Sequence, residues 1–176
     1  MLVIREATPA DAPTIVDFNT RMAWETEHKR LAPEVITAGV EAALAQPLYA
    51  RYFVAEHTDP GSDVAQLGYP ATESFGVGVP EIVGQLMITY EWSDWRNGMF
   101  WWVQSVYVRE ENRRSGIFSK LLNHVDGMAR STPGTCGLRL YVEHENADAI
   151  ATYRRLGFVP SGHALYEIDW SRGSSK

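Results

Sequence analysis

Cysteine is almost absent from this chain of 176 residues, which carries a single thiol at Cys136. One cysteine excludes an intrachain disulfide and leaves no material for a cysteine-based metal cluster. The five histidines do not occur at the spacings of metal ligands, so we expect no bound metal. Cys136 is therefore expected to be a small packed residue in or beside a strand.

Long apolar runs and clusters of basic residues are also lacking. No stretch of eighteen apolar residues occurs, so we expect no membrane-spanning helix. Residues 1–6 lack the basic segment and apolar segment of a signal peptide, which predicts a cytoplasmic protein. The net charge of −6 and the absence of a basic face argue against nucleic acid as a partner.

The composition is that of a soluble globular domain, with 45% hydrophobic and 22% charged residues. A chain of this length suits one domain with a sizeable core, and we place that domain at residues 1–170. A segment rich in Gly, Pro, Ser and Asp, at about 57–80, is long for a hairpin loop and is predicted to be an insertion or a lid. Residues 171–176 are predicted to form a flexible tail.

Hydrophobic periodicity predicts an α/β (α+β) fold with a mixed central sheet of about six to seven strands and about four helices. The turn signal Asn97-Gly98 separates two long strands, the second of which is apolar on both faces. The predicted strands lie near 3–7, 52–55, 81–91, 99–108 and 138–142, with a final pair beginning at 157–158 and ending at 166–170. The predicted helices run from about 11 to 29, 33 to 46, 116 to 132 and 147 to 156.

The strand that ends at Val108 leads through a short turn into the helix that begins near Gly116. A helix start presents unpaired backbone N–H groups and the positive end of the helix dipole, which suits a diphosphate. Gly116 allows such a group to approach the backbone closely. Neither the Walker motif nor the dinucleotide-binding glycine motif is present, and the alternative is an ordinary strand–turn–helix in which Arg113 and Arg114 are merely solvated.

A second stretch contains a strand at 138–142, then Asn146, and then a helix that ends in Tyr153-x-x-x-Gly157-Phe158. Together with Arg113-x-x-Gly116-x-Phe118 it resembles the two motifs of the GNAT superfamily of N-acetyltransferases. The segment from Ile4 to Asp11 is also similar to the opening of that family, so the resemblance covers nearly the whole chain. Phe118 stands where the family prefers Gly or Ala, and it either turns into the core or narrows the site.

The resemblance implies direct transfer of an acetyl group from acetyl-CoA to a primary amine of a small molecule. It implies that Tyr153 is the acid for the leaving thiolate, the alternative being a core aromatic residue. It implies that Asn146 contacts the pantetheine arm, the alternative being a helix cap. The other implied coenzyme-binding residues are Val106, Tyr107 and Val108 on a strand that splays from its neighbour, and Arg113, Arg114, Ser115, Gly116, Ile117, Phe118 and Ser119 around the pyrophosphate.

The general base is less clearly marked in the sequence. Glu91, at the end of a central strand, is our candidate, with Asp94, Glu25 and Glu143 behind it; each is alternatively a solvated or structural carboxylate. In similar enzymes the first two helices form the acceptor pocket, which implies substrate contacts for Trp24 and Glu25.

Trp92 and Trp95, near the Asn97-Gly98 turn, are predicted to form a substrate wall, because an aromatic ring can hold an ammonium ion by cation–π attraction.

Three other functions remain open from the sequence. The acceptor is alternatively a protein lysine or amino terminus, or the chain is a non-catalytic acyl-CoA-binding regulatory module. A nucleotide-binding protein of another fold is the third. Members of the family often form dimers, so the resemblance also implies a homodimer.

Overall fold

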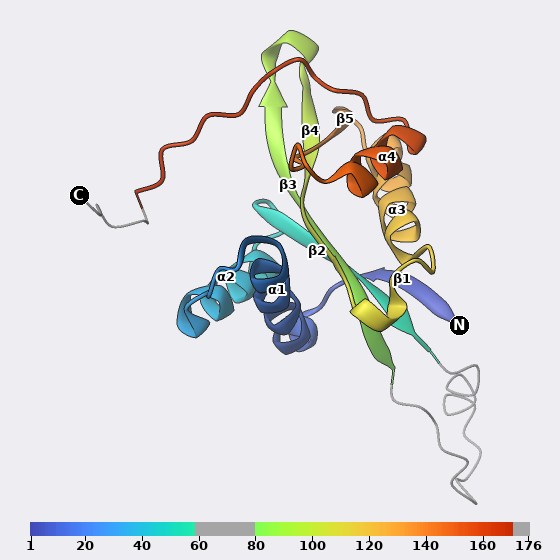
Figure 1. Cartoon of the computed structure of the whole chain (residues 1–176). Helices are drawn as coiled ribbons and strands as arrows, with labels where there is room; N and C mark the ends of the chain where they lie inside the picture. The colour runs from blue at the N-terminus through green and yellow to red at the C-terminus, as the bar shows by residue number, and fades with distance from the viewer. Residues whose placement is uncertain (59–79, 171–176) are drawn as a thin grey trace, which may run out of the picture. The chain divides into compact units, whose positions relative to one another are not determined.

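The computed structural model describes residues 1–58 and 80–170 (Figure 1). These residues form two compact units, Met1–Tyr141 and Val142–Lys176. The predicted insertion at 57–80 and the predicted tail at 171–176 lie almost entirely outside the described residues. A single domain over 1–170 therefore stays a prediction, and each unit is described by itself.

The first unit is built on one mixed sheet whose strands follow one another in chain order. The first four strands are antiparallel neighbours, and the last is parallel to the fourth. A parallel neighbour requires a crossover connection, which a helix between the two strands supplies. The strands are β1 (Leu2–Glu6), β2 (Ala50–His57), β3 (Glu81–Ser93), β4 (Gly98–Val108) and β5 (Thr135–Leu140).

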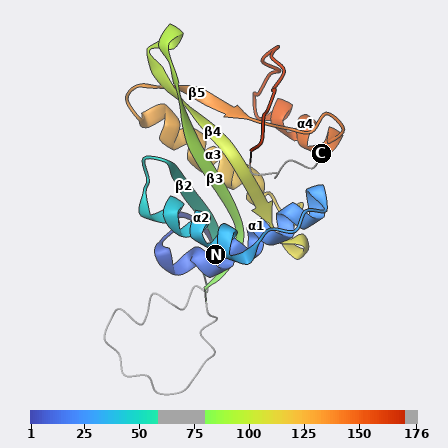
Figure 2. The ribbon, with the colours of Figure 1, turned by 90° about the vertical axis from the view of Figure 1, so that its left-hand side faces the viewer.

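Helices cover both faces of this sheet (Figures 1 and 2). α1 (Ala12–Glu27) and α2 (Pro33–Ala45) lie on one face, and α3 (Ile117–Ser131), the crossover helix, lies on the other. Proline at the first position begins α2, where its missing N–H costs nothing. α1 ends at Glu27, and the left-handed φ of 50° at the next residue, His28, stops the helix.

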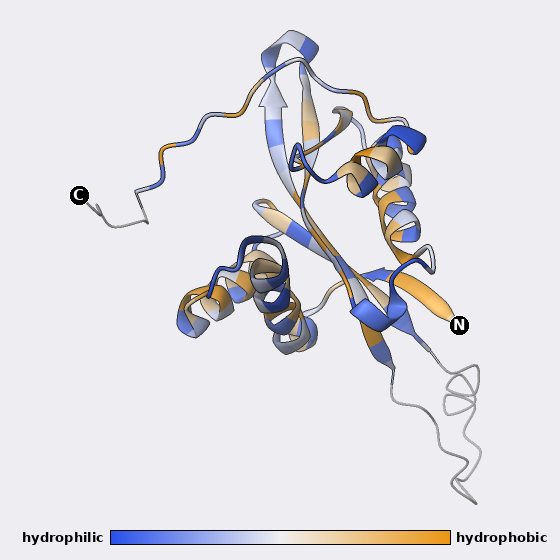
Figure 3. Cartoon of the chain, viewed as in Figure 1, coloured by the Kyte–Doolittle hydropathy of each residue, from blue (hydrophilic) through white to orange (hydrophobic). Residues whose placement is uncertain are grey.

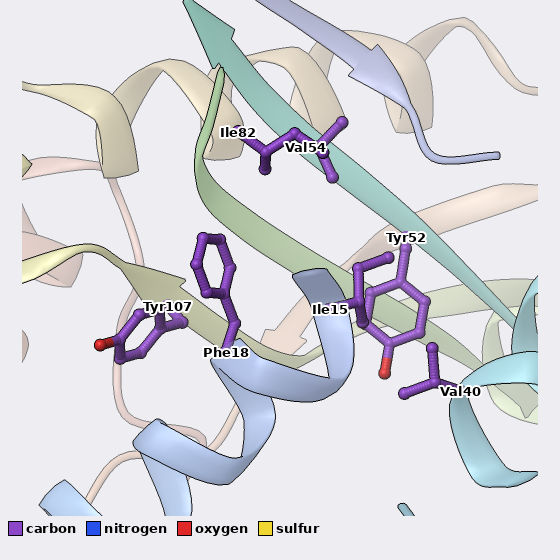
Figure 4. Packing of buried hydrophobic residues seen from close by; sticks show 7 residues of the cluster. All are labelled: Ile15, Phe18, Val40, Tyr52, Val54, Ile82 and Tyr107. Carbon is purple, nitrogen blue, oxygen red and sulfur yellow. The ribbon is translucent and has the colours of Figure 1, made fainter. Parts of the chain in front are cut away.

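The core on the α1 side joins that helix to the middle of the sheet (Figure 4). Phe18 of α1 contacts Tyr107 of β4 with a distance of 5.0 Å between ring centroids. Ile15 lies near Tyr52 of β2 in the same cluster. This packing fixes the end of β4 against α1, which is where the candidate site lies.

The start of α1 is stabilised by an ion pair between Arg5 and Asp11, and the Asp11 side chain is almost fully buried. The carboxylate of Asp11, with a side chain 8% exposed, accepts hydrogen bonds from both Nη atoms of Arg5, at 2.8 and 2.9 Å. It also accepts from the backbone N–H of Thr8 at 2.6 Å, as in a capping box. The Arg5 guanidinium holds the pKa of Asp11 below its usual range despite burial.

We expect Asp11→Asn to lower the free energy of unfolding by about 2 kcal/mol at neutral pH, because the amide loses the charge-assisted bonds and leaves Arg5 with Glu56 as its one carboxylate partner among the described residues. The pKa of Asp11 is depressed in the folded state. The stabilisation is therefore complete above the usual carboxyl pKa, and it is lost as the pH falls through the folded value. Denaturant unfolding at several pH values measures both effects. Asp17→Asn, which breaks an exposed pair with Arg21, is the control and should cost under about 0.5 kcal/mol; equal losses would contradict the expectation.

The second unit contains α4 (Ala147–Arg155). Asn146 caps its start, with Oδ1 accepting from the N–H of Ala149 at 3.0 Å. At its end Gly157 has a φ of 89°, and the N–H groups of Gly157 and Phe158 donate to the carbonyls of Arg154 and Tyr153. This is a Schellman motif, completed by the ring contact between Tyr153 and Phe158, with centroids 6.0 Å apart. The spacing Tyr-x-x-x-Gly-Phe is thus a helix-ending signal.

The predicted count of six to seven strands is wrong, because the described part of the chain forms five. Residues 158–170 contain no strand, and β5 ends at Leu140 rather than at residue 142. Alternating apolar residues predict an extended chain, but a strand also needs a partner to take its backbone hydrogen bonds. The predicted mixed α/β sheet and the four helices are confirmed.

Candidate active site

β5 is shorter than β4 and ends partway along it. Their parallel pairing runs from Met99 to Val103, which lies opposite Leu140, the last residue of β5. β4 continues for five more residues to Val108 while keeping its antiparallel pairing with β3 on the other edge. No described strand pairs with the second edge of β4 over these residues, because β5 has ended; that β4 splays from a neighbouring strand stays a prediction. Backbone N–H and C=O groups along this edge suit an extended, amide-containing arm.

The loop that follows β4 has a shape suited to an anion. Arg114 has a φ of 63° and Gly116 a φ of 80°, and a Cβ added to Gly116 would meet nothing within 4 Å. The loop is hydrophilic and exposed (Figure 3). The first bond inside α3 is from the N–H of Lys120 to the carbonyl of Gly116, at 3.1 Å. The first N–H groups of a helix have no preceding turn to bond to, and together with the helix dipole they make the start of α3 suited to a diphosphate.

Arg113 takes part in this loop through its side chain rather than its amide. Its N–H already donates to the carbonyl of Glu110 at 3.2 Å. The Arg113 amide is thus engaged within the loop, and contact of residues 113–119 with a pyrophosphate stays a prediction. The Arg113 guanidinium instead donates from Nε to the carbonyl of Val108, at 3.0 Å, and from Nη2 to Glu25, at 2.5 Å.

A pocket of about 620 Å³ opens between the end of α1 and the end of β4. It brings together residues that are far apart in the sequence and that were predicted to bind different ligands. The predicted acceptor residues Trp24 and Glu25 and the predicted coenzyme residues Val106, Tyr107, Val108 and Arg113 all line it.

Glu25 is the carboxylate at the centre of this arrangement. Its Oε1 accepts from the Tyr107 hydroxyl at 2.9 Å, and its Oε2 accepts from Arg113. Burial alone would raise the pKa of Glu25, but these two hydrogen bonds outweigh it, and the pKa lies below the usual range. Burial and the Glu25 charge together raise the pKa of Tyr107. At neutral pH the site thus holds a carboxylate, a guanidinium and a neutral phenol.

Glu91, the predicted base, lies elsewhere on the sheet. It is opposite Phe100, six residues and roughly 20 Å along β4 from Val106. Its carboxylate accepts from the indole N–H of Trp102 and from Arg139, and these bonds lower its pKa although burial alone would raise it. Its contacts are those of a structural ion pair, and its catalytic role stays a prediction.

Trp92 and Trp95, the predicted substrate wall, are not part of this pocket. Trp95 is 90% exposed in the turn between β3 and β4. Trp92 lies opposite Met99, seven residues and roughly 23 Å along β4 from Val106. Their contact with substrate stays a prediction that this pocket does not support.

His28 also lines the pocket and was missed by the sequence reasoning. Its ring contacts Trp24, with centroids 5.7 Å apart. The clue in the sequence was weak: a histidine just past the last turn of a helix is usually a solvated cap.

Asn146 and Tyr153 belong to the second unit. Asn146 caps α4, which is the alternative role expected for it, and its contact with the pantetheine arm stays a prediction. Burial raises the pKa of Tyr153, which keeps its phenol protonated at neutral pH. A protonated phenol is what a general acid needs.

Comparisons with known proteins agree with this geometry. A sequence model of the acetyltransferase (GNAT) family matches residues 42–158. A crystal structure of a possible acetyltransferase from Clostridium difficile 630 is 40% identical, with 96% of this chain and 97% of that chain covered and a TM-score of 0.77. The chain therefore belongs to the GNAT family of acetyltransferases, whose co-substrate is acetyl-CoA.

Two more distant structures share the fold alone. Ribosomal-protein-alanine N-acetyltransferase from Brucella melitensis biovar Abortus 2308 is 15% identical, with 96% and 99% of the two chains covered and a TM-score of 0.66. An aminoglycoside acetyltransferase from an uncultured soil metagenomic sample, in complex with sisomicin, is 14% identical, with 96% and 97% covered and a TM-score of 0.65. A comparison with curated proteins gives no match.

Across residues 1–58 and 80–170, no group of three or more His, Cys, Asp or Glu side chains is placed to hold a metal ion. Among the same residues, no helix combines the length and the apolar character needed to cross a membrane.

Proposed function

We propose that this protein is an N-acetyltransferase that moves the acetyl group of acetyl-CoA onto a primary amine of a small molecule. The observation that carries the proposal is the exposed start of α3 at Gly116, which follows, after a short loop, the end of β4 that extends beyond β5. A diphosphate at the first site and a pantetheine arm along the second belong to one molecule, coenzyme A.

The chain's own residues hold the coenzyme at two places. Amides from Arg114 to Ser119 bind the diphosphate, and each charge-assisted hydrogen bond contributes about 1.5–3 kcal/mol. The second edge of β4, from Gln104 to Val108, pairs with the amides of the pantetheine arm. Asn146 adds a contact to that arm from the start of α4.

The thioester of acetyl-CoA supplies the acetyl group. A backbone N–H near Val106 to Val108 polarises the acetyl oxygen, which is the usual electrostatic device for acyl transfer. The pocket beside Trp24 and Glu25 orients the amine toward the acetyl carbon. Tyr153 donates its phenolic proton to the departing sulfur.

The size of the pocket favours a small acceptor. Sites for small molecules commonly measure about 300–1,000 Å³, and this pocket, at about 620 Å³, lies within that range. The two distant enzymes named above act on different kinds of acceptor and share only the fold with this chain. The proposal of a small acceptor therefore rests on the volume of the pocket.

The amine must also lose a proton before it attacks. An amine with a pKa near 10.4 is only about one thousandth neutral near pH 7.4, which adds about 4 kcal/mol to the barrier. Glu91 remains the predicted base. Two carboxylate residues, Glu25 and Glu110, line the pocket itself.

Calorimetry with acetyl-CoA, followed by a thiol-release assay over a panel of primary amines, tests the proposal. We expect acetyl-CoA to bind and at least one small amine to accelerate thiol release. Binding without amine-dependent release would favour the regulatory module. Binding of ATP or NAD without acetyl-CoA would overturn the proposal.

A further inference from the structure

Both carboxylate oxygens of Glu25 are occupied in this structure. Tyr107 donates to Oε1, and Arg113 donates to Oε2. A cationic amine that enters the pocket therefore meets a carboxylate whose charge is already balanced by a guanidinium. The Tyr107 bond comes from a buried strand residue, so it fixes the direction of the carboxylate whatever Arg113 does.

The Arg113 bond is the one that can be exchanged. The side chains of Arg113 and Glu25 are 42% and 37% exposed, and ion pairs with this exposure contribute under about 1 kcal/mol. Arg113 also stands three residues before Gly116, at the start of the loop that binds the diphosphate under the proposed function. A diphosphate carries more negative charge than one carboxylate, and guanidinium groups bind phosphate oxygens in a two-point geometry.

We propose that Glu25 is the residue that selects a cationic acceptor, and that Arg113 releases it for that purpose when the coenzyme binds. Arg113 moves from Glu25 to the diphosphate, and Oε2 then receives the ammonium or a second cationic group of the acceptor. No covalent bond changes in this step. The inference rests on the proposed function, because it requires the diphosphate to bind at the α3 loop.

The exchange links the two ligands. The coenzyme takes Arg113 from the ion pair, and the acceptor takes Glu25. Binding of either ligand therefore frees the residue that the other needs. Thermodynamic reciprocity makes the two effects on binding affinity equal. A fixed ion pair, which only ties α1 to β4, would not couple the ligands in this way. An exchanged ion pair predicts that removal of the Glu25 charge tightens CoA binding, whereas a fixed ion pair predicts unchanged or weaker binding.

That measurement is the affinity for CoA of the Glu25→Gln variant by titration calorimetry. Removing the competitor for Arg113 should tighten CoA binding by about threefold, in line with a partly exposed ion pair. Arg113→Gln should weaken CoA binding by about fivefold or more. In the double variant, Glu25→Gln should have no further effect, which separates the exchange from a general loss of negative charge. Asp126→Asn, which breaks an exposed pair on α3, is the matched control and should leave CoA affinity unchanged.

The same substitution should weaken binding of the acceptor amine. For the amines that release thiol in the assay above, Glu25→Gln should raise the KM of the amine by about tenfold while the KM of acetyl-CoA falls. Thermal melting of each variant confirms that it is folded.

Unchanged or weaker CoA binding by Glu25→Gln, or tightening that persists without Arg113, would overturn the inference and leave the proposed function intact. Wild-type protein that fails to bind CoA would overturn both.

Discussion

Tyr153→Phe is expected to lower the rate of acetyl transfer by at least about tenfold, the scale of a lost general acid, while the affinity for CoA stays within about twofold. The ring of Tyr153 packs edge-on against Phe158 at the end of α4, and phenylalanine preserves that contact. The helix-ending hydrogen bonds involve backbone atoms only, so the substitution leaves them in place. The change thus removes one proton donor without removing packing.

The pH dependence gives an independent check on this role. An acid works only while it is protonated, and burial raises the pKa of Tyr153 above that of a free phenol. The wild-type rate should therefore fall as the pH rises through this elevated value, and the fall should be absent in Tyr153→Phe. Tyr166→Phe, an exposed residue of the same unit, is the control and should retain full activity. A wild-type rate in Tyr153→Phe would remove this residue from the acid role.

Much of the fold follows from local patterns in the sequence. β4 is apolar on both faces because it is covered by α1 on one side and α3 on the other. The turn at Asn97 lies where it was predicted, with a left-handed φ of 44° that asparagine tolerates. These features depend on residues that are close together in the chain, so the sequence alone is sufficient to predict them.

Features that depend on distant partners were harder to predict. The apolar alternation at 165–170 indicates a strand, but whether a strand forms depends on a partner edge that local sequence does not specify. The contact between Glu25 and Arg113 joins residues 88 positions apart. The sequence predicted a role for each, one with the acceptor and one with the coenzyme, but no pattern indicated that they share a hydrogen bond.

The candidate base shows the same difficulty. A glutamate at the end of a central strand is a reasonable candidate base from sequence. In the structure, however, the Glu91 carboxylate accepts hydrogen bonds from Trp102 of β4 and from Arg139 of β5. Those partners engage the carboxylate and hold its pKa low. Pairing across a sheet, rather than position in the chain, decides how basic such a group is.

Gly116→Ala is expected to weaken CoA binding by about tenfold or more. At a φ of 80° the added methyl group costs about 1–2 kcal/mol of backbone strain but meets no protein atom within 4 Å. Under the proposed function, the methyl group enters the space through which the diphosphate reaches the amides at the start of α3. The loss of even one charge-assisted hydrogen bond there, about 1.5–3 kcal/mol, accounts for a change of this size.

Gly134→Ala separates this effect from strain. Gly134 has a φ of 79°, and a Cβ added there also meets nothing within 4 Å, so the two substitutions should lower the melting temperature to a similar extent. Gly134 lies in the turn between α3 and β5, at the opposite end of α3 from the loop that we propose binds the diphosphate. Titration of both variants with CoA should therefore show a large loss for Gly116→Ala and none for Gly134→Ala. Equal affinities in the two variants would mean that the diphosphate does not approach the backbone at Gly116, and the assignment of the coenzyme to this loop would have to be abandoned.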